Sequence, residues 1–447
     1  MRVLHVPFSY YPSPHGGTEV YVAALANSLQ SHGVASTIAA PGEHNETYEW
    51  AGLTVHRFKT SSNAGLESLY GEGDELAAAA FGRILDRVHP DLVHFHALTP
   101  GASVLAMRET KRRGIPLLFT YHTPTVSCVR GTMMKWGRTP CEGTMNARLC
   151  TACALHGKGL PKIAGIAMAA AHAGMQAWLG KKLGNGKLAT ALQMPALVRK
   201  RHAATRTAFE LSDRVVAVCD WVRKVLLANG VPKDKVTLCR QGLPATRPVT
   251  IAGGVFSLPP EKLTSARPLR LAYFGRLDPT KGVQVVIEAL QRKPKLPIHF
   301  DIYGIAQGDT GIKWQSLLTQ MAKADKRVRF LEPVESTNVA AVMRAYDLIV
   351  APSIWLETGP LVAYEAFAAG VPVLGTNLGG IAELVVDGQT GRLLPAGNVQ
   401  AWLDELGLLV ERPGDIADWR SRLPQARTMS DAATEMAEQY KTCLEIK

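Results

Sequence analysis

Short apolar strands alternate with helical segments along most of this chain, and the alternation comes in two separate series. The first series occupies residues 2–238 and the second begins at residue 269. Strands that alternate with helices predict βαβ units and a parallel sheet, and strands without polar alternation suit a sheet covered on both faces. At 447 residues the chain is also too long for one compact core. We therefore expect an α/β protein with two doubly wound parallel-sheet domains.

The periodicity places the individual elements. In the first half we expect strands at 2–7, 34–40, 53–58, 91–95, 116–120, 214–218 and 236–238, and helices at 18–31, 75–88 and 221–229. In the second half we expect strands at 269–274, 297–303, 328–331, 348–351 and 371–375, and helices at 283–291, 314–323 and 360–369.

Interruptions of this pattern predict the domain boundaries. A stretch with five prolines and two adjacent glycines ends at residue 268 and predicts a linker. We expect a first domain over 1–245, with a Cys-rich loop at 125–155 and a basic helical insert at 160–206, then a linker over 246–268, a second domain over 269–429 and a closing helix over 430–447. Ligands in open parallel sheets bind beyond the carboxyl ends of the strands, so we expect the two domains to face each other across one deep cleft.

Positive charge restricts the partners. Lys and Arg number 50 against 38 Asp and Glu, which gives a formal net charge of +12. This balance favours phosphorylated metabolites, nucleic acid or an anionic membrane surface. The sequence lacks a basic stripe interleaved with aromatic residues, so we expect no nucleic acid partner.

Two segments bear on localisation. The chain begins with an apolar strand and without the basic and apolar regions of a signal peptide, so we expect a cytoplasmic protein. The run 163–179 is mostly Ala and is a poor membrane-spanning segment, but Lys181 and Lys182 follow it directly. The basic stretch 160–206 is then either a helical bundle with a solvated basic face or a peripheral segment that docks on the inner, anionic face of a membrane.

Glycines follow the first strand, where Gly16 and Gly17 precede a helix. Glycines at this position let backbone N–H groups approach a ligand closely, and a helix N-terminus favours an anion. The alternative is a tight strand-to-helix turn capped by Thr18. The spacing is not that of a dinucleotide-binding loop.

A pair of cations opens the second series. Arg276 directly follows a strand, and Lys281 stands at the start of the next helix. Both charges would point to the carboxyl edge of the sheet, where a diphosphate accepts bidentate and point-charge contacts. The alternative is a solvated pair of loop residues, and the spacing is not that of a Walker loop.

Two acids flank the predicted start of a helix. Glu357 lies in the loop before it, and Glu365 lies little more than one turn inside the helix that Pro360 begins. The free N–H groups around Gly359 and Leu361 offer an anion site between the two carboxylates. Each acid can then accept hydrogen bonds from hydroxyls on its own side of a phosphate, which is the layout of a sugar–diphosphate–ribose. Taken alone, Glu365 could equally be a capping or salt-bridged helix residue.

Taken together and in this order, the motifs resemble those of the retaining glycosyltransferases of family 4, which have the GT-B fold of two facing Rossmann-like domains with a cleft between them. The matching stretches cover both halves of the chain and are HGGTEVYV, PDLVHFHA, FTYHT, SDRVVAVCDWVRKVL, FGRLDPTKG and the E-x7-E stretch with AFAAGVPVLGTNLGGIAELVVDGQTGRLLP. The chain departs from the family pattern at Arg240-Gln241-Gly242-Leu243, where Asn-Gly-Val-Asp is frequent, and at Cys219, which replaces a serine after a strand.

The resemblance implies a role for each matching residue. Glu357 would contact the donor sugar, Glu365 the ribose hydroxyls, and His122 would approach the sugar. Reaction on the front face would proceed through an oxocarbenium-like state, without Glu357 as a covalent nucleophile. The expected catalytic residues are Glu357, His122, Lys281 and Arg276; the expected donor-binding residues are Gly16, Gly17, Arg276, Lys281, Glu357, Gly359, Pro360, Leu361 and Glu365; and the expected acceptor-binding residues are His96 and Arg130.

Four of the seven cysteines fall in one loop, with the spacing C-x12-C-x8-C-x2-C for Cys128, Cys141, Cys150 and Cys153. Four such thiolates can surround Zn²⁺, and this Arg/Gly-rich loop lacks apolar residues to hold itself together. We expect a structural Zn²⁺ there, with an iron–sulfur cluster or four unrelated thiols as alternatives. The other three cysteines are expected to be ordinary packed residues.

The expected function is what the resemblance implies, and the acids and the cations are consistent with it. The chain would move a hexose-type sugar from a UDP- or GDP-sugar to a glycan or a lipid-linked acceptor, in cell-surface polysaccharide or lipopolysaccharide biosynthesis. We expect no catalytic metal, because Arg276, Lys281 and helix N–H groups would neutralise the leaving diphosphate. The alternatives are a GT-B nucleotide-sugar epimerase, which acts on the donor alone, and a binding protein that does no chemistry.

Overall fold

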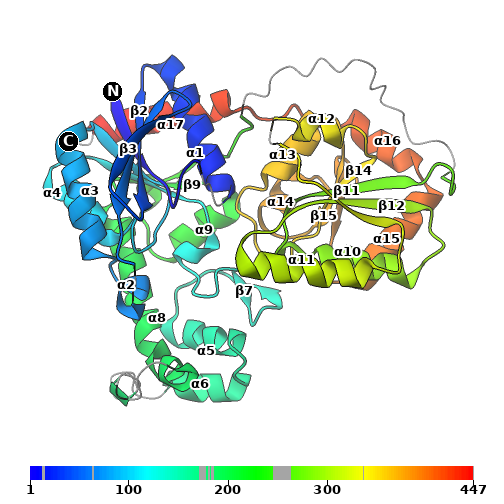
Figure 1. Cartoon of the computed structure of the whole chain (residues 1–447), viewed down its shortest axis with the longest axis horizontal. Helices are drawn as coiled ribbons and strands as arrows, with labels where there is room; N and C mark the ends of the chain where they lie inside the picture. The colour runs from blue at the N-terminus through cyan, green and yellow to red at the C-terminus, as the bar shows by residue number, and fades with distance from the viewer. Residues whose placement is uncertain are drawn as a thin grey trace. The chain divides into compact units, whose positions relative to one another are not determined.

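The computed structural model describes residues 1–12, 16–62, 65–170, 178–179, 182, 186–244, 263–335 and 337–445. The chain forms two compact units, shown in Figure 1: the first unit is Met1–Arg240 with Met429–Lys447, and the second unit is Gln241–Thr428. Each unit contains a parallel or mainly parallel sheet covered by helices, which confirms the expected α/β class. Most of the expected linker over 246–268 lies outside the described residues.

The sheet of the first unit has eight strands in the order β10-β9-β6-β5-β1-β2-β4-β3. All neighbours pair in parallel except β3 and β4. From the central β1 the chain moves to β2 on one side and later to β5 on the other, so the winding reverses between β1 and β5. The strands are β1 (Arg2–Val6), β2 (Ala35–Gly42), β3 (Glu46–Trp50), β4 (Leu53–Lys59), β5 (Leu92–Phe95), β6 (Leu117–Tyr121), β9 (Arg214–Ala217) and β10 (Val236–Leu238).

Helices cover both faces of this sheet. α1 (Gly17–Ser28) and α17 (Met429–Glu445) bury their apolar side chains against one face. α3 (Glu75–Val88), α4 (Val104–Arg112), α9 (Asp220–Ala228) and the end of α8 (Lys187–Leu211) cover the other. The closing helix of the chain therefore completes the core of its first unit, as the ribbon of Figure 1 also shows.

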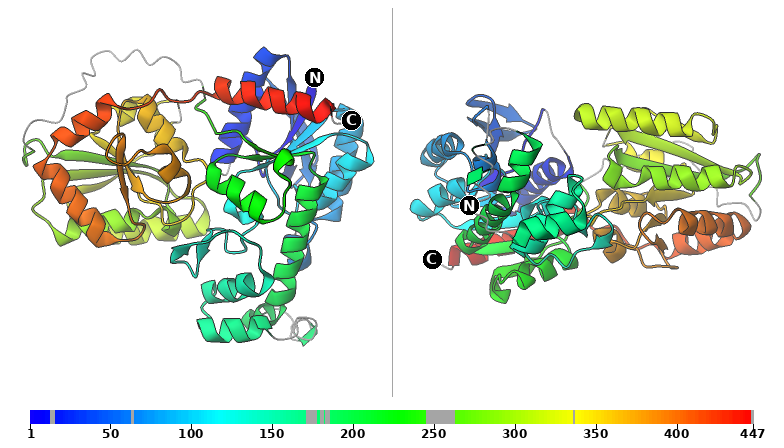
Figure 2. Two further views of the ribbon diagram at one scale, coloured as in Figure 1. Left: turned by 180° about the vertical axis from the view of Figure 1, so that it is seen from behind. Right: turned by 90° about the horizontal axis from the view of Figure 1, so that it is seen from below.

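An insert extends from the first unit between β6 and β9. Its members are η2 (Pro124–Val126), the hairpin of β7 (Met134–Lys135) and β8 (Thr139–Pro140), α5 (Ala147–Gly157), α6 (Lys162–Ala170) and the first turns of α8. Figure 2 shows α5 and α6 beside the end of α8 that points away from the sheet of this unit. A small apolar cluster joins α5 to α8 through Leu155, Met194 and Val198.

The sheet of the second unit has six parallel strands in the order β13-β12-β11-β14-β15-β16. The winding reverses between β11 and β14, which is where open sheets of this kind bind ligands. The strands are β11 (Leu269–Arg276), β12 (Ile298–Ile305), β13 (Val328–Leu331), β14 (Leu348–Ala351), β15 (Val373–Thr376) and β16 (Gly391–Leu394). α10 (Val283–Arg292), α11 (Gly308–Ala322), α15 (Val399–Glu411) and α16 (Gly414–Ser421) cover one face, and α12 (Val339–Met343), α13 (Leu361–Ala368) and α14 (Gly379–Leu384) cover the other.

Some elements differ from those predicted: β3 and α4 were not expected, and α13 begins later than expected. β3 is an exposed edge strand without a buried face, so its sequence ETYEW carries no apolar alternation. α4 is charged over its second half, although the Ser103 side chain caps its start by accepting from Ala106 N–H. α13 begins at Leu361, one residue later than predicted, with Pro360 as its cap.

Among the described helices, none is both long enough and apolar enough to cross a membrane.

Candidate active site

The loops after β11 and β14 meet at the reversal point of the second unit. β11 leads through η4 (Pro279–Lys281) into α10, and β14 leads through a loop into α13. Because β11 and β14 pair directly, both loops lie at the same carboxyl edge of the sheet. There Lys281 Nζ donates to Glu357 Oε1 at 2.6 Å. Lys281 and Glu357, which the sequence predicts to bind the same ligand, are thus hydrogen-bonded to each other.

Glu357 is held in place on several sides. Its carboxylate is buried, and Oε1 also accepts from Ser353 Oγ at 2.7 Å. Burial alone would raise the pKa of Glu357, but the Lys281 ammonium and the hydrogen bonds from Lys281 and Ser353 outweigh it and hold the pKa below its usual value. The Lys281 ammonium also lies 5.3 Å from the centre of the Trp355 ring. Glu357 is therefore an ionised acceptor with a fixed orientation.

Glycine backbones bring these loops together. Gly282 has a φ of +76°, and a Cβ there would lie 1.8 Å from the Pro352 carbonyl oxygen. Gly379, at the start of α14, has a φ of +51°, and a Cβ there would lie 2.7 Å from the Glu357 carbonyl oxygen. The next amide, that of Gly380, donates to this same carbonyl at 2.7 Å. No side chain fits at Gly282 or Gly379 without displacing the acid loop.

Glu365 lies on α13, one helix after this loop. It is half-buried, and no hydrogen bond or ion pair of its carboxylate is found within the described part of the chain. Burial raises the pKa of Glu365 to about 7. A buried carboxyl without a protein donor can accept hydrogen bonds from ligand hydroxyls, which is the role that the sequence predicts for it.

The start of α13 brings backbone close to a side chain of the same unit. A Cβ at Gly359 would lie 2.2 Å from the Gln241 Oε1 atom, so a larger residue there would have to displace the Gln241 side chain. Pro360 and Leu361 follow as the cap and the first residue of the helix. The N–H groups at this end remain the expected anion site.

Arg276 is the last residue of β11 and is exposed. Its carbonyl oxygen accepts from the Tyr273 hydroxyl at 2.6 Å, while its guanidinium has no protein partner among the residues that the structure describes. Arg276 thus has the freedom to reach a phosphate, whereas Lys281 is already engaged.

The side chain of Glu19 lies against the glycine loop of the first unit. Gly16, not Thr18, caps α1, and its N–H donates to Glu19 Oε2 at 2.9 Å. Glu19 is buried and also accepts from Ser9 Oγ at 3.1 Å. Because a carboxylate already lies at this helix N-terminus, an anion near Gly16 and Gly17 has to share it with Glu19.

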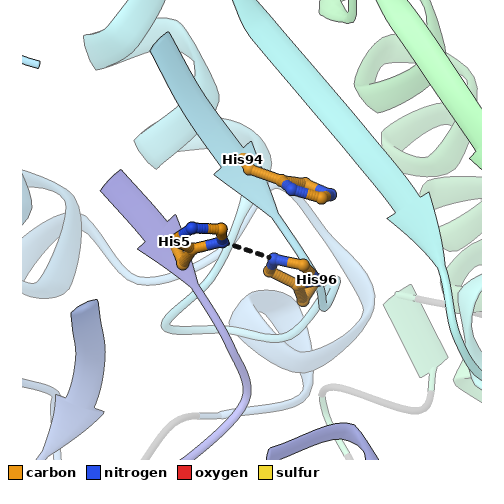
Figure 3. A group of neighbouring side chains, drawn as sticks. All are labelled: His5, His94 and His96. Carbon is orange, nitrogen blue, oxygen red and sulfur yellow. Dashed lines mark hydrogen bonds between the residues drawn. The ribbon is translucent and has the colours of Figure 1, made fainter. Parts of the chain in front are cut away.

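Four buried histidines lie across the central strands of the first unit. His5 Nδ1 is 3.1 Å from His96 Nε2, and His96 Nδ1 is 3.0 Å from His122 Nε2. Figure 3 shows His5 and His96 joined in this way, with the ring of His94 beside them. Both ring nitrogens of His96 are therefore engaged, and a direct contact of His96 with an acceptor requires one of these hydrogen bonds to break.

His94 is held from two other elements. Its Nδ1 lies 2.8 Å from the Tyr440 hydroxyl of α17, and its Nε2 lies 2.7 Å from Thr120 Oγ1 of β6. Ligand atoms of His5, His94 and His96 lie within 4.8 Å of one another, close enough for a shared metal ion. Since hydrogen bonds already occupy the nitrogens of His94 and join His5 to His96, the trio fits a hydrogen-bonded network better than a metal centre.

Burial keeps these histidines neutral. It lowers the pKa of His5 and of His122 to about 3, and it places the pKa values of His94 and His96 well below the usual value. His122 is 3% exposed, with its ring 4.9 Å from that of Tyr21. His122 can therefore act near neutral pH as a hydrogen-bonding group, not as an imidazolium.

The insert holds the remaining predicted residues. Arg130 donates from Nη1 to the Cys153 carbonyl oxygen at 3.2 Å, so its guanidinium supports the insert. The thiols of Cys128, Cys141, Cys150 and Cys153 are all half-buried and none is in a disulfide. Burial, and then repulsion from the other three thiols, raises the pKa of Cys150 to about 12 although the Asn146 backbone lowers it. The four thiols therefore lie near one another.

The predicted basic insert is only partly described. Residues 171–177, 180, 181 and 183–185 lie outside the described residues. On α8, Arg201 donates to the carbonyl oxygens of Leu98 and Thr125, and Lys200 pairs with Glu67. On α6, Ile163 is 83% exposed and Ile166 is 53% exposed. Part of the positive charge is thus used inside the unit, while apolar side chains remain at its surface.

Sequence reasoning missed Ser353, Glu19, Tyr440 and Thr120 as partners of the predicted residues. Glu19 stands inside the Gly-Gly-Thr-Glu motif, and a first-turn acid after a glycine turn signals a capping carboxylate. Ser353 lies four positions before Glu357, in the same loop after a strand. A hydroxyl so close to an acid in one loop could have indicated the hydrogen bond between them. Tyr440 and Thr120 carry no local signal, because only the tertiary fold brings them to His94.

Comparisons with known families agree with this layout. The model described as "Glycosyl transferase 4-like domain" matches residues 16–242, and the model described as "Glycosyl transferases group 1" matches residues 258–428. A D-inositol 3-phosphate glycosyltransferase of Corynebacterium efficiens is 37% identical over 175 residues, which is 37% of this chain and 40% of that protein. The matched region thus spans about two fifths of the length of this curated relative.

Solved structures share the fold. HepE of Anabaena, solved in complex with UDP and glucose, has a TM-score of 0.65 at 17% identity and covers 98% of this chain and 99% of its own. Sucrose-phosphate synthase of Thermosynechococcus elongatus has a TM-score of 0.64 at 16% identity and covers 100% of both chains. At these identities the likeness establishes the architecture of the chain and not its substrates.

Proposed function

The chain belongs to the glycosyl transferase 4-like family of GT-B glycosyltransferases, and from this premise we propose that it is a retaining transferase that moves a sugar from a nucleotide diphosphate sugar to a glycan or a lipid-linked acceptor. The donor would be a UDP- or GDP-sugar. HepE, which shares its fold, binds UDP and UDP-glucose, so UDP-glucose is the first donor to test. The acceptor would belong to cell-surface polysaccharide or lipopolysaccharide biosynthesis.

One observation carries the proposal. Glu357, Lys281 and Glu365 lie on the loops and the helix that follow β11 and β14, at the reversal point of their sheet. The buried, ionised Glu357 suits the hydroxyls of a donor sugar, and Glu365 suits those of a ribose. The cations Lys281 and Arg276 suit the diphosphate between them.

The transfer would proceed on one face of the sugar. The bond between the anomeric carbon and the leaving diphosphate oxygen breaks, and the acceptor hydroxyl oxygen bonds to the same face of that carbon. The leaving diphosphate takes the hydroxyl proton. Arg276, Lys281 and the N–H groups at the start of α13 stabilise the charge that develops on the diphosphate.

The first unit would supply the acceptor side. Gly16 and Gly17 would approach the donor phosphate, His122 would hydrogen-bond to the sugar as a neutral imidazole, and His96 would act through His122, to which it is bonded. Arg130 would contribute through the insert that it supports.

Donor binding and transfer are tested in two steps. A thermal-shift panel of UDP- and GDP-sugars identifies the donor, because a ligand at one hundred times its Kd adds about 2.7 kcal/mol of stability. With that donor, Lys281→Ala or Arg276→Ala should lower kcat/KM by about 2–4 kcal/mol of transition-state stabilisation. Lys295→Ala, an exposed lysine of the same unit, is the matched control. Wild-type turnover by Lys281→Ala and Arg276→Ala would refute the diphosphate assignment.

The reaction class is tested with labelled donor. Incubation with inositol phosphate, glycan and lipid-linked acceptors should move the label to one of them and release nucleoside diphosphate. Conversion of the donor sugar without any acceptor would instead identify an epimerase. Binding without chemistry under every condition would identify a nucleotide-sugar binding protein.

We propose further that the insert docks peripherally on an anionic membrane. The exposed Ile163 and Ile166 of α6 lie next to the basic residues Lys158 and Lys162, which is the composition of an interfacial segment. Flotation with vesicles that contain anionic lipid should retain the protein at low salt and release it at high salt. Equal recovery with and without anionic lipid would contradict membrane docking.

A further inference from the structure

Four cysteines that the proposed transfer does not use converge in the insert of the first unit. Cys128 follows η2, Cys141 follows β8, and Cys150 and Cys153 are three residues apart on α5, hence on one face of that helix. After burial, electrostatic repulsion from the thiols of Cys128, Cys141 and Cys153 contributes to the raised pKa of Cys150. The thiols of Cys128 and Cys153 contribute in the same way to the raised pKa of Cys141. Three separate segments therefore bring the four cysteines into one region of the insert.

Backbone amides point at these sulfur atoms. The Trp136 N–H donates to Cys153 Sγ at 3.2 Å, and the Gly143 amide hydrogen-bonds to the Cys141 thiol. Trp136 and Gly143 both have positive φ values, +58° and +82°, so tight turns direct their amides inward. Amide donors favour the ionised form of a sulfur atom, which is the form that a metal ion binds.

The hairpin among these segments is short, although Met133 and Met134 are buried and Asn229 at the end of α9 donates to the Gly143 carbonyl oxygen. β7 and β8 are two residues long, and a two-stranded hairpin of that length is not stable alone. α5 packs on α6 and α8, but the hairpin contributes no residue to the apolar cluster between those helices. A metal ion would add a cross-link between the hairpin and α5.

We propose that Cys128, Cys141, Cys150 and Cys153 bind one Zn²⁺ ion, which fixes the hairpin and η2 to α5. A tetrathiolate zinc site carries a net charge of −2. Two cations near the cysteines can balance this negative charge. Arg130 donates to the Cys153 carbonyl oxygen, and Lys135 acts on the Cys141 thiol. This proposal is independent of the proposed transfer reaction.

The sulfur atoms lie farther apart in the structure than they would around a bound zinc ion. In the described structure no three of them lie within 4.8 Å of one another. Zn–S bonds of about 2.3 Å place the sulfur atoms of a tetrahedral site about 3.8 Å apart. Zinc would therefore draw them inward, and the glycine turns at Gly131, Gly137 and Gly143 allow that movement.

Metal content tests the proposal directly. The full chain, purified under reducing conditions and dialysed, should contain about one zinc per chain by elemental analysis. The variant Cys150→Ser/Cys153→Ser should lose that zinc. Cys219→Ser is the matched control, because it makes the same change outside the cluster, at the N-cap of α9 where serine is favoured. The control should keep its zinc.

A second measurement uses the unchanged chain, in case the double variant fails to fold. Co²⁺ substituted into the wild-type protein should give the intense visible absorption of tetrahedral thiolate coordination. Removal of the metal should speed hydrogen exchange in residues 128–157 and leave the strands of the second unit unchanged. Protein without stoichiometric zinc that also fails to take up added Zn²⁺ or Co²⁺ would overturn the proposal. Iron with inorganic sulfide, or a disulfide between any two of the four cysteines, would overturn it as well.

Discussion

Lys281 and Glu357 form an ion pair at the carboxyl edge of the second sheet, where we propose that the donor binds. The ion pair offsets the cost of burying the carboxylate and keeps the ammonium at the edge of the sheet. A diphosphate that approaches Lys281 competes with Glu357 for the ammonium protons. As the lysine turns toward phosphate, Glu357 loses a donor and gains capacity to accept from sugar hydroxyls. Binding of the two ends of the donor is therefore expected to be coupled.

Glu365 provides a prediction at the same scale. Its pKa is raised by burial to about 7, so about half of the ligand-free chains carry a protonated Glu365 at that pH. If the bound ribose requires the carboxylate, affinity for a nucleotide sugar should rise about tenfold between pH 6 and pH 8. Isothermal titration calorimetry with the identified donor measures this. A nucleotide sugar is the right ligand, because its diphosphate does not titrate in this range.

Glu365→Gln separates the titration of this residue from other pH effects. The variant should bind more weakly than wild type at pH 8, and its affinity should vary little between pH 6 and pH 8. A wild-type affinity that does not change over this range would contradict a ribose contact through the ionised acid.

At this scale the sequence predicted which residues lie together at the edge of the second sheet, but not how they contact one another. Glu357, Lys281 and Glu365 were chosen as ligand-binding residues, and the structure places them on adjacent loops and on the helix that follows. Their assigned roles remain predictions. The hydrogen bond between Lys281 and Glu357 could not be predicted, because the 76 positions between them close only when β11 pairs with β14.

Helix α17 shows the same limit at the scale of elements. Its helical pattern is evident in the sequence, and its bounds of Met429–Glu445 agree closely with the predicted 430–447. Its buried face packs on α1 and the strands of the first unit, and the Tyr440 hydroxyl reaches His94. His94 lies 346 positions before Tyr440, so the helix was predictable and its hydrogen bond to His94 was not.

Tyr440 tests the contribution of that contact. Tyr440→Phe should lower the free energy of unfolding of the first unit by about 1–2 kcal/mol, because His94 Nδ1 loses its buried partner. Tyr440→Ala should cost about 3–5 kcal/mol, because it also empties a fully buried aromatic site. Denaturant unfolding of the full chain measures both values.

Thr442→Val, on the same helix, is the control and should change stability little, because the half-buried Thr442 hydroxyl donates to the Glu438 carbonyl oxygen of the helix itself. Equal stability of Tyr440→Phe and wild type would mean that His94 finds another donor or acceptor.

At the scale of the whole molecule, the two units should respond to acid in opposite directions. Among the described residues, the first unit contains six buried histidines whose pKa values are all lowered by burial, that of His202 to about 4: His5, His56, His94, His96, His122 and His202. The unfolded chain binds protons below about pH 6.5 while the folded unit does not, so stability is present above that pH and is lost as the pH falls. The loss is about 1.4 kcal/mol per histidine for each pH unit.

The second unit should gain stability over part of the same range. The raised pKa of Glu365 means that the folded unit binds a proton between about pH 7 and 4.5 that the unfolded chain does not, so this contribution is lost as the pH rises. Calorimetry from pH 5 to pH 8 should resolve a transition of the first unit that moves to lower temperature with acid. A transition of the first unit that stays constant or rises below pH 6 would contradict the neutral state of the histidines.

Because α17 packs in the first unit, the order of synthesis affects how that unit folds. Because the residues of the second unit are inserted between β10 and α17, the first sheet leaves the ribosome well before its last helix exists. During that interval the face that later receives Met436 and Tyr440 stays uncovered. The second unit, continuous in sequence, can fold within that interval. A nascent chain arrested before residue 429 is therefore expected to need a chaperone on its earlier half, although that half was synthesised first.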